Sequence, residues 1–253
     1  MKQTLLTLLL IFLPIMASAD DSGSCGDGLT YSYVEATHTL TISKTGDGTG
    51  AMANYDNFAN YAPWNAYRAQ ILQIIIETGV TSIGHYAFDG CIGLTSITIS
   101  NSVTSIGDGV FCNCSGLTSI SIPNGLKSIS NYTFFGCSGL TSIIIPDGVI
   151  SIGDNAFCGC SSLISISIPN SVTFIGRSAF QECSSLTSIK IPDGVTSIGQ
   201  TAFRYCTSLT SISIPDGVIS IDNYLFAECY ALISVTLPIS ITSIGNDAFY
   251  NCI

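Results

Sequence analysis

Hydrophobic and polar positions follow one another along this chain in a pattern that returns every 23 residues. In the unit 184–206, Leu186, Ile189 and Ile191 suit one face of a short strand, because alternate side chains of a strand share a face. A Pro-Asp-Gly sequence comes next, and Val195 begins a second extended segment. Proline fixes φ, aspartate bonds to the local backbone and glycine accepts a positive φ, so a turn is predicted between the two segments.

The end of each unit has a different spacing. Ala202, Phe203 and Cys206 are separated by one and three positions, which is typical of a single helical turn. Units of this length at a fixed period predict a solenoid, in which each coil packs on its neighbours. We therefore predict an α/β solenoid of eight coils over residues 69–252, each built from short strands and a short helical turn.

Residues 20–68 do not repeat, and we predict that they form a cap over the first coil. Leu29–Tyr33 and Thr39–Ser43 alternate apolar and polar residues around a turn at 35–37, which predicts a β-hairpin. An aromatic cluster with the only tryptophan of the chain comes next: Tyr55, Phe58, Tyr61, Trp64 and Tyr67. Such a cluster can form a ligand cage or a platform for glycans, but large rings also cover an exposed coil well, and we favour the cap.

Residues 1–19 have the pattern of a secretory signal peptide. Lys2 supplies a positive charge, Leu5–Met16 is apolar, and residues 17–19 are the small residues Ala-Ser-Ala. We predict cleavage after Ala19. The apolar segment is too short for a stable membrane anchor, and no later run of eighteen apolar residues occurs. We therefore expect an exported protein, secreted or at the cell surface, that does not insert into the membrane.

The repeated pattern resembles the 23-residue BspA-like class of leucine-rich repeats. Units of that class read L-x-x-I-x-I-P-x-x-V-x-x-I-G-x-x-A-F-x-x-C, and residues 69–252 carry the pattern eightfold. The resemblance implies a right-handed leucine-rich-repeat stack, an amino-terminal cap, and attachment to host or matrix proteins or to other cells. One departure is the asparagine that many leucine-rich repeats have after the strand, which is replaced in five units: Gly125, Gly148, Ser171, Gly194 and Gly217. We also expect no carboxy-terminal cap, because the sequence ends at Ile253, one residue after the last unit.

Eleven cysteines in an exported chain would fit a disulfide framework. Eight of them occupy one column, with one member in each coil: Cys91, Cys114, Cys137, Cys160, Cys183, Cys206, Cys229 and Cys252. Stacked neighbours would lie about 5 Å apart, but their Cβ vectors would run parallel, so we predict free, buried thiols beside phenylalanine. Cys112 and Cys158 each stand two residues before a column cysteine with no histidine nearby, which is unlike a zinc site.

The charge and the polar residues argue against several classes of function. Charged residues make up 9% of the chain and its net charge is −10, which disfavours binding to nucleic acid or anionic membranes. The only histidines, His38 and His85, have no context typical of a hydrolytic triad, so we expect neither an enzyme nor a cofactor. Six turn residues could supply oxygen atoms to calcium, but ordinary turn chemistry explains them, since calcium needs six or more converging oxygens: Asn101, Asn124, Asp147, Asn170, Asp193 and Asp216.

The outward positions of the first strand are the candidate binding surface, here called the strand face. They carry mostly hydroxyl groups and are interrupted at Ile144 and Lys190: Ser119, Ser121, Ser142, Ile144, Ser165, Ser167, Ser188, Lys190, Ser211 and Ser213. Solenoids bind through extended faces, and a monotonous face favours weak, multivalent recognition over one hot spot. Small hydroxyl residues also keep a sheet soluble without binding anything, and this alternative stays open.

The leading hypothesis is a non-enzymatic adhesion module that binds extracellular or cell-surface proteins, and it rests on analogy because a fold does not fix a function. The alternative is a structural protein that self-associates through the last coil, around Ile241, Ile244 and Phe249, or a fragment of a longer array. A third hypothesis is an ice-binding solenoid. That function would favour a flat threonine surface, whereas this face is mostly serine with one lysine and one isoleucine.

Overall fold

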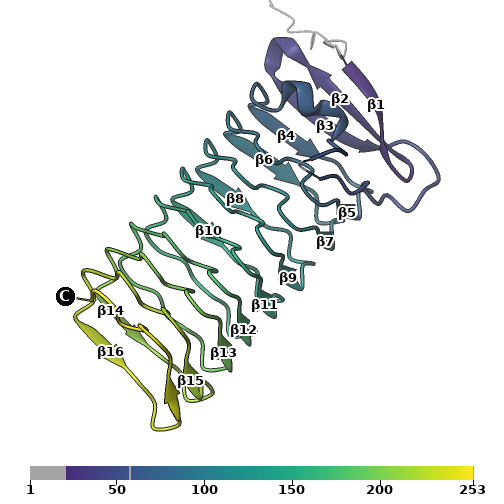
Figure 1. The fold of residues 1–253 in the computed structure, drawn as a ribbon. Helices are drawn as coiled ribbons and strands as arrows, with labels where there is room; N and C mark the ends of the chain where they lie inside the picture. The colour runs from purple at the N-terminus through teal and green to yellow at the C-terminus, as the bar shows by residue number, and fades with distance from the viewer. Residues whose placement is uncertain (1–20, 57, 253) are drawn as a thin grey trace, which may run out of the picture.

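The computed structural model describes residues 21–56 and 58–252, so the predicted signal peptide lies outside the described residues. The chain forms an elongated stack of coils, with the N-terminal segment at one end and the C-terminal coil at the other (Figure 1). The predicted solenoid is confirmed.

The first extended segment of each coil belongs to a row of parallel pairing along the stack, and it forms a strand in six of the eight coils. The row contains six strands: β4 (Gln73–Ile76), β6 (Ser96–Ile99), β8 (Ser119–Ser121), β10 (Ser142–Ile144), β14 (Ser211–Ser213) and β16 (Ser234–Thr236). Single bridges such as Ser167 to Lys190 continue the row between β10 and β14. Each pair joins residues 23 positions apart, for example Ser119 with Ser142, so a column of the sequence becomes a line on the surface.

The second extended segment of each coil forms another row. It contains eight two-residue strands, one for each predicted unit: β5 (Ser82–Ile83), β7 (Ser105–Ile106), β9 (Ser128–Ile129), β11 (Ser151–Ile152), β12 (Phe174–Ile175), β13 (Ser197–Ile198), β15 (Ser220–Ile221) and β17 (Ser243–Ile244). Their serines point outward and their isoleucines inward through most of the row, as the alternation of a strand requires.

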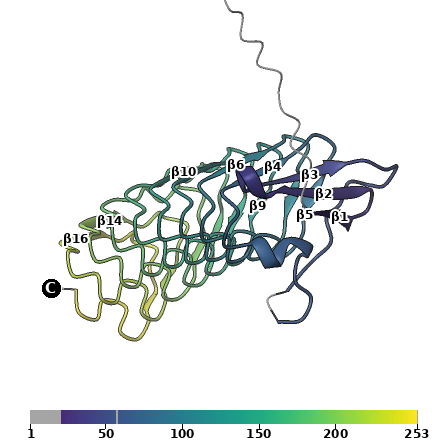
Figure 2. The same cartoon turned by 90° about the horizontal axis from the view of Figure 1, so that it is seen from above.

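The N-terminal segment adds an antiparallel unit to the first row. β1 (Asp21–Gly26), β2 (Leu29–Val34) and β3 (Thr39–Lys44) pair antiparallel, and the short 3-10 helix η1 (Glu35–Thr37) joins β2 to β3. The predicted hairpin is therefore confirmed. β3 then pairs parallel with β4, so that β1–β3 continue the first sheet beyond the repeats, as seen from above in Figure 2.

A column of stacked aromatic rings fills the interior along the whole array. Neighbouring centroids of its eight phenylalanines are 5.3 to 5.8 Å apart: Phe88, Phe111, Phe134, Phe157, Phe180, Phe203, Phe226 and Phe249. Trp64, from the 3-10 helix η2 (Pro63–Tyr67), extends this column at its N-terminal end, with its ring 5.6 Å from Phe88. The hydrophobic core is thus continuous from the N-terminal segment into the repeats.

The segment predicted as a helical turn has a different form. Consecutive turns with i to i+3 hydrogen bonds are present, such as the bond from Cys91 N–H to the Phe88 carbonyl at 3.3 Å. However, two residues in each coil have positive φ, for example Tyr86 at 50° and Gly90 at 71°, and a right-handed helix excludes that conformation. The reason is a bond between coils, because the N–H of Gly90 donates to Cys112 in the next coil at 2.8 Å.

Candidate binding surface

The ten strand-face residues are all exposed in the structure and lie in register along the rod. Ser119 stacks on Ser142 through β8 and β10, and Ser188 stacks on Ser211 through a bridge. Ile144 is the large apolar member of this face, with 78% of its surface exposed. The sequence pattern and the strand pairing therefore bring these residues together as one surface.

The serine hydroxyls of the strand face have no protein partner within the described residues. By contrast, the threonines on the edges of the strands donate to carbonyls of the preceding coil. Thr141 Oγ1 donates to Thr118 at 3.2 Å, and Thr210 Oγ1 donates to Thr187 at 3.4 Å. The fold thus uses the threonine hydroxyls internally and leaves the serine hydroxyls of the strand face available to water or to a ligand.

The strand face is hollowed in its C-terminal half. A shallow depression of ≈ 420 Å³ lies over β14, β16 and the preceding coil, and Ser188, Lys190, Asp193, Ser211 and Thr236 are among its lining residues. It combines hydroxyl groups with one cation and one carboxylate. The sequence singled out Ser188 and Lys190 as a departure from the repeated face, and both residues line this depression.

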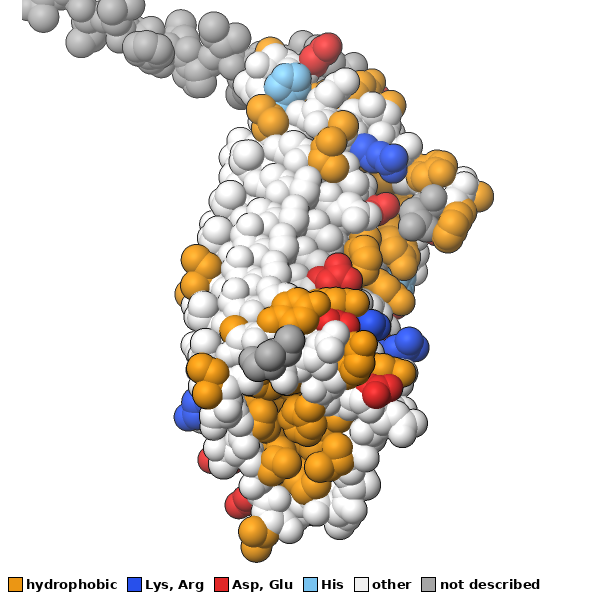
Figure 3. Space-filling model, turned by 60° about the vertical axis from the view of Figure 1, so that its left-hand side comes forward, with side chains coloured by type: hydrophobic (Ala, Val, Ile, Leu, Met, Phe, Trp, Pro, Cys, Tyr) orange, Lys and Arg blue, Asp and Glu red, His pale blue; other side chains and the backbone are white. Residues whose placement is uncertain are grey.

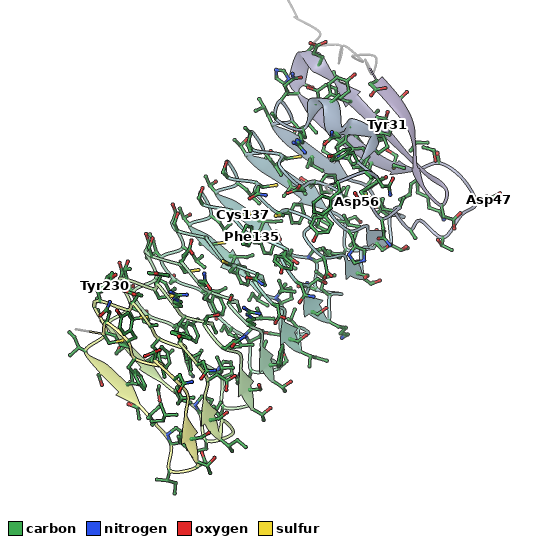
Figure 4. The ribbon with its side chains drawn as sticks, in the orientation of Figure 1. Tyr31, Asp47, Asp56, Phe135, Cys137 and Tyr230 are labelled. Atoms are coloured by element: carbon green, nitrogen blue, oxygen red, sulfur yellow. The ribbon has the colours of Figure 1, made fainter. Side chains whose placement is uncertain are left out.

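The column cysteines lie inside the coils, as Figure 4 shows for Cys137. All eleven cysteines are unpaired, and every one except Cys252 is buried. Each column thiol from Cys114 onward donates to the carbonyl of the phenylalanine 26 residues earlier, for example Cys137 Sγ to Phe111 at 3.0 Å. Burial raises the pKa of the Cys137 thiol to about 12, so it is protonated at neutral pH and can act as this donor.

The repeated unit matches the sequence profile of a known protein family. A profile of the BspA type leucine rich repeat region matches in six copies over residues 65–184 and 127–253. The chain belongs to this family. Comparison with curated proteins gave no match.

Solved structures of leucine-rich repeat proteins resemble the chain over most of its length. The T. pallidum protein TpLRR is 26% identical, with a TM-score of 0.55 and coverage of 89% of this chain and 86% of that one. A leucine-rich repeat protein from Bacteroides ovatus has 25% identity, a TM-score of 0.47, and coverage of 90% and 80%. A leucine rich cell surface protein from Faecalibacterium prausnitzii has 24% identity, a TM-score of 0.46, and coverage of 93% and 87%.

The structure shows how this BspA-type array bonds its backbone without the asparagine after the strand. From Cys114 onward, each column thiol donates to one carbonyl of the preceding coil, in the turn segment. In units where serine takes the place of glycine after the strand, the serine hydroxyl donates to a second carbonyl. Ser102 Oγ donates to the Val80 carbonyl at 2.7 Å, and Ser171 Oγ donates to the Val149 carbonyl at 2.5 Å. Serine therefore supplies a side-chain donor at that position in the units that carry it, whereas four units have glycine there: Gly125, Gly148, Gly194 and Gly217.

A second row of side chains was not predicted from the sequence. His85 Nδ1 accepts from the N–H of Asp108 at 2.9 Å, Asp108 accepts from Asn131 at 3.1 Å, and Asn131 accepts from Asp154 at 2.8 Å. Arg177 has no acceptor at this position and interrupts the row, which resumes at Asn223, where the side chain accepts from the N–H of Asn246 at 2.7 Å. The signal was the mixture of histidine, aspartate and asparagine in one column, and the position of His85 in it gives this histidine a structural role.

The aromatic cluster of the N-terminal segment divides into buried and exposed members. Trp64 is 1% exposed and its indole N–H donates to the Ala87 carbonyl at 2.8 Å, while Tyr55 packs edge-on against it. Tyr67 stacks on Tyr33 with centroids 4.5 Å apart. Phe58 is 85% exposed, so it does not cover the first coil.

Metal sites and membrane-spanning helices are both absent from the part of the chain that the structure describes. No group of three or more histidine, cysteine, aspartate or glutamate side chains converges there in a way that could hold a metal ion. In residues 21–56 and 58–252, no helix is long and apolar enough to cross a membrane.

Proposed function

We propose that this BspA-type repeat protein is an exported, non-enzymatic binding module that attaches to extracellular or cell-surface proteins through its strand face. The observation that carries the proposal is the line of exposed serines whose hydroxyls are free of internal hydrogen bonds. Many weak contacts along such a line add up when the partner is itself extended or repeated. The leader pattern of residues 1–19 and the family resemblance support a secreted or surface location.

The strand face can be tested with substitutions that leave the core untouched. In the face variant, Ser165, Ser188 and Ser211 are changed to glutamate. In the control variant, Ser105, Ser197 and Ser243 of the second strand row receive the same change, and these serines are exposed as well. We expect the face variant to lose binding to immobilised matrix proteins and whole cells, and the control to keep it. Equal binding by both variants would remove the strand face from the function.

A second candidate function is self-association, and the C-terminal coil favours it. Ile244 is 55% exposed, whereas the equivalent Ile221 one coil earlier is 1% exposed. Figure 3 shows hydrophobic side chains gathered at this end of the molecule. A second copy or further coils would cover this surface. Light scattering over a range of concentrations tests the first option, since a mass that stays that of one chain contradicts it.

A further inference from the structure

One column of the turn segment directly precedes the column cysteine in each coil. All eight of its residues have positive φ, from 55° to 75°: Gly90, Asn113, Gly136, Gly159, Glu182, Tyr205, Glu228 and Asn251. Glycine takes this conformation without a steric cost, whereas residues with a Cβ do not. The first half of the array uses mainly glycine here. Glu182, Tyr205 and Glu228 instead place three large side chains in a row in consecutive coils, exposed at Glu182, half-buried at Tyr205 and buried at Glu228.

Tyr205 forms the centre of this row and already binds a cation of its own chain. The guanidinium of Arg204 lies 4.7 Å from the centroid of the Tyr205 ring and 5.6 Å from that of Tyr224. An Arg204 N–H also donates to the Tyr205 hydroxyl at 3.3 Å. The two tyrosine rings thus hold one guanidinium of the chain itself, because the face of an aromatic ring attracts positive charge.

Glu228, on one side of Tyr205, is held in place by its neighbours. Only 9% of its surface is exposed, and its carboxylate accepts from the Tyr230 hydroxyl at 2.6 Å and from the Asn251 amide at 3.1 Å. These hydrogen bonds, with the nearby charge of Arg204, hold the pKa of Glu228 below its usual range. Figure 4 places Tyr230 at the outer edge of the stack near its C-terminal end.

Glu182, on the other side of Tyr205, is exposed and borders an open hollow. The hollow has a volume of ≈ 470 Å³ and is lined by Ser161, Glu182, Ser184, Tyr205 and Thr207. These residues present a carboxylate, an aromatic ring and hydroxyl groups to a side chain that enters the hollow. Figure 3 shows acidic, basic and hydrophobic side chains lying next to one another in the C-terminal half of the visible face.

We propose that this turn-face cluster binds a basic segment of a partner protein, with an arginine or lysine side chain entering the hollow between Glu182 and Tyr205. The cluster is defined here as Glu182, Arg204, Tyr205, Tyr224, Glu228 and Tyr230. Its two carboxylates outnumber its one guanidinium, and the whole chain has a net charge of −10, so a cationic partner is complementary at short and long range. The site is separate from the strand face and goes beyond the function proposed for it.

The test uses the full mature chain and labelled ten-residue probes of alternating Arg-Gly and alternating Lys-Gly, with a Gln-Gly peptide as the neutral probe. Fluorescence anisotropy at physiological salt measures binding. We expect the wild type to bind the basic probes, and Glu182→Gly and Tyr205→Gly to weaken binding at least tenfold. Gly90, Gly136 and Gly159 occupy the same column, so both variants should fold. A urea midpoint no lower than that of the wild type would confirm that they do.

Two matched controls separate the site from general effects. Asn113→Gly makes the same backbone change in the same column, three coils before the cluster of Glu182. Asp216→Asn removes one exposed negative charge from the repeat unit that contains Glu228, at a residue that lines neither the hollow nor the strand-face depression. Both controls should bind within twofold of the wild type. Equal weakening by Asp216→Asn would show that only net charge attracts the peptides. Absence of binding to the basic probes, or a preference for neutral oligosaccharides, would also overturn the proposal.

Discussion

At the scale of single residues, the column cysteine combines two properties that the fold needs together. Cys137 is fully buried beside the phenylalanine column, and its thiol donates to the Phe111 carbonyl at 3.0 Å. That carbonyl also accepts from the N–H of Cys114 at 3.2 Å. The sequence predicted a small hydrophobic residue here, which describes the burial of the thiol but omits its hydrogen bond. A buried carbonyl with two donors explains why a thiol suits this position better than an alanine would.

This hydrogen bond predicts an order of stability for two substitutions. Cys137→Ala leaves a small cavity and removes the donor, and we expect it to lower the free energy of unfolding by about 1–3 kcal/mol. Cys137→Ser keeps a donor and should cost less. Urea denaturation measures both values. Cys158, which is buried but makes no such hydrogen bond, is the control site, and serine should have no advantage over alanine there. If serine is the worse substitution at Cys137 too, the thiol acts only as an apolar filler.

At the scale of elements, the segment η2 joins the N-terminal region to the array. Trp64 continues the phenylalanine column, stacks on Phe88 at 5.6 Å, and bonds to Ala87 through its indole N–H. The repeats cannot bury the first ring of the column by themselves, because no earlier coil exists to cover it. A single aromatic residue from outside the repeats therefore completes the core of the first coil.

The role of Trp64 can be measured against an aromatic neighbour that faces solvent. Trp64→Ala should lower the free energy of unfolding by about 3–5 kcal/mol, the range for truncating a large buried aromatic residue. Phe58→Ala is the matched control, and because Phe58 is 85% exposed its truncation should change stability by less than about 0.5 kcal/mol. Thermal unfolding followed by circular dichroism reports both effects. Similar losses in the two variants would contradict the assignment of Trp64 as the covering residue.

The elements differ in how far the sequence determined them. The two strand rows could be predicted because each depends on a local alternation that repeats eight times. The turn segment was predicted as helical from the spacing of Ala202, Phe203 and Cys206, but its positive φ values come from hydrogen bonds to the next coil. Spacing within a unit contains no information about bonds between units. For the same reason, the turn-face residues Glu182 and Tyr205 were not singled out, although they replace glycine in their column.

At the scale of the whole molecule, repetition multiplies the properties of one unit. Burial raises the pKa of Cys229 to about 12 and holds the pKa values of Cys160, Cys183 and Cys206 well above the usual thiol value. One such thiol has little influence on stability near neutral pH, because it is protonated in the folded and the unfolded chain alike. A column of them makes the array as a whole sensitive to alkaline pH.

The direction of this sensitivity follows from proton binding. Well below pH 9.0, the ordinary pKa of the thiol, neither state releases a proton and the contribution to stability is complete. Above that pH the unfolded chain releases protons that the folded chain retains, so the free energy of unfolding falls by about 1.4 kcal/mol per pH unit for each buried thiol. The loss continues until the pH reaches the folded pKa, which is about 12 for Cys137. Several thiols together should remove most of a typical stability of about 5–15 kcal/mol by roughly pH 10–11.

Urea midpoints measured at intervals from pH 7 to pH 10.5 test this prediction, with the absorbance of the thiolate at 240 nm recorded in parallel. We expect a flat profile up to about pH 9 and a steep fall beyond it, with thiolate appearing only as the chain unfolds. A double variant, Cys137→Ala with Cys160→Ala, should be less stable at pH 7 but lose stability more gradually as the pH rises. Its slope should be smaller by about 1.4 kcal/mol per pH unit for each of the two thiols removed. An unchanged slope in this variant would mean that tyrosine or lysine titration, rather than the cysteine column, limits the array at high pH.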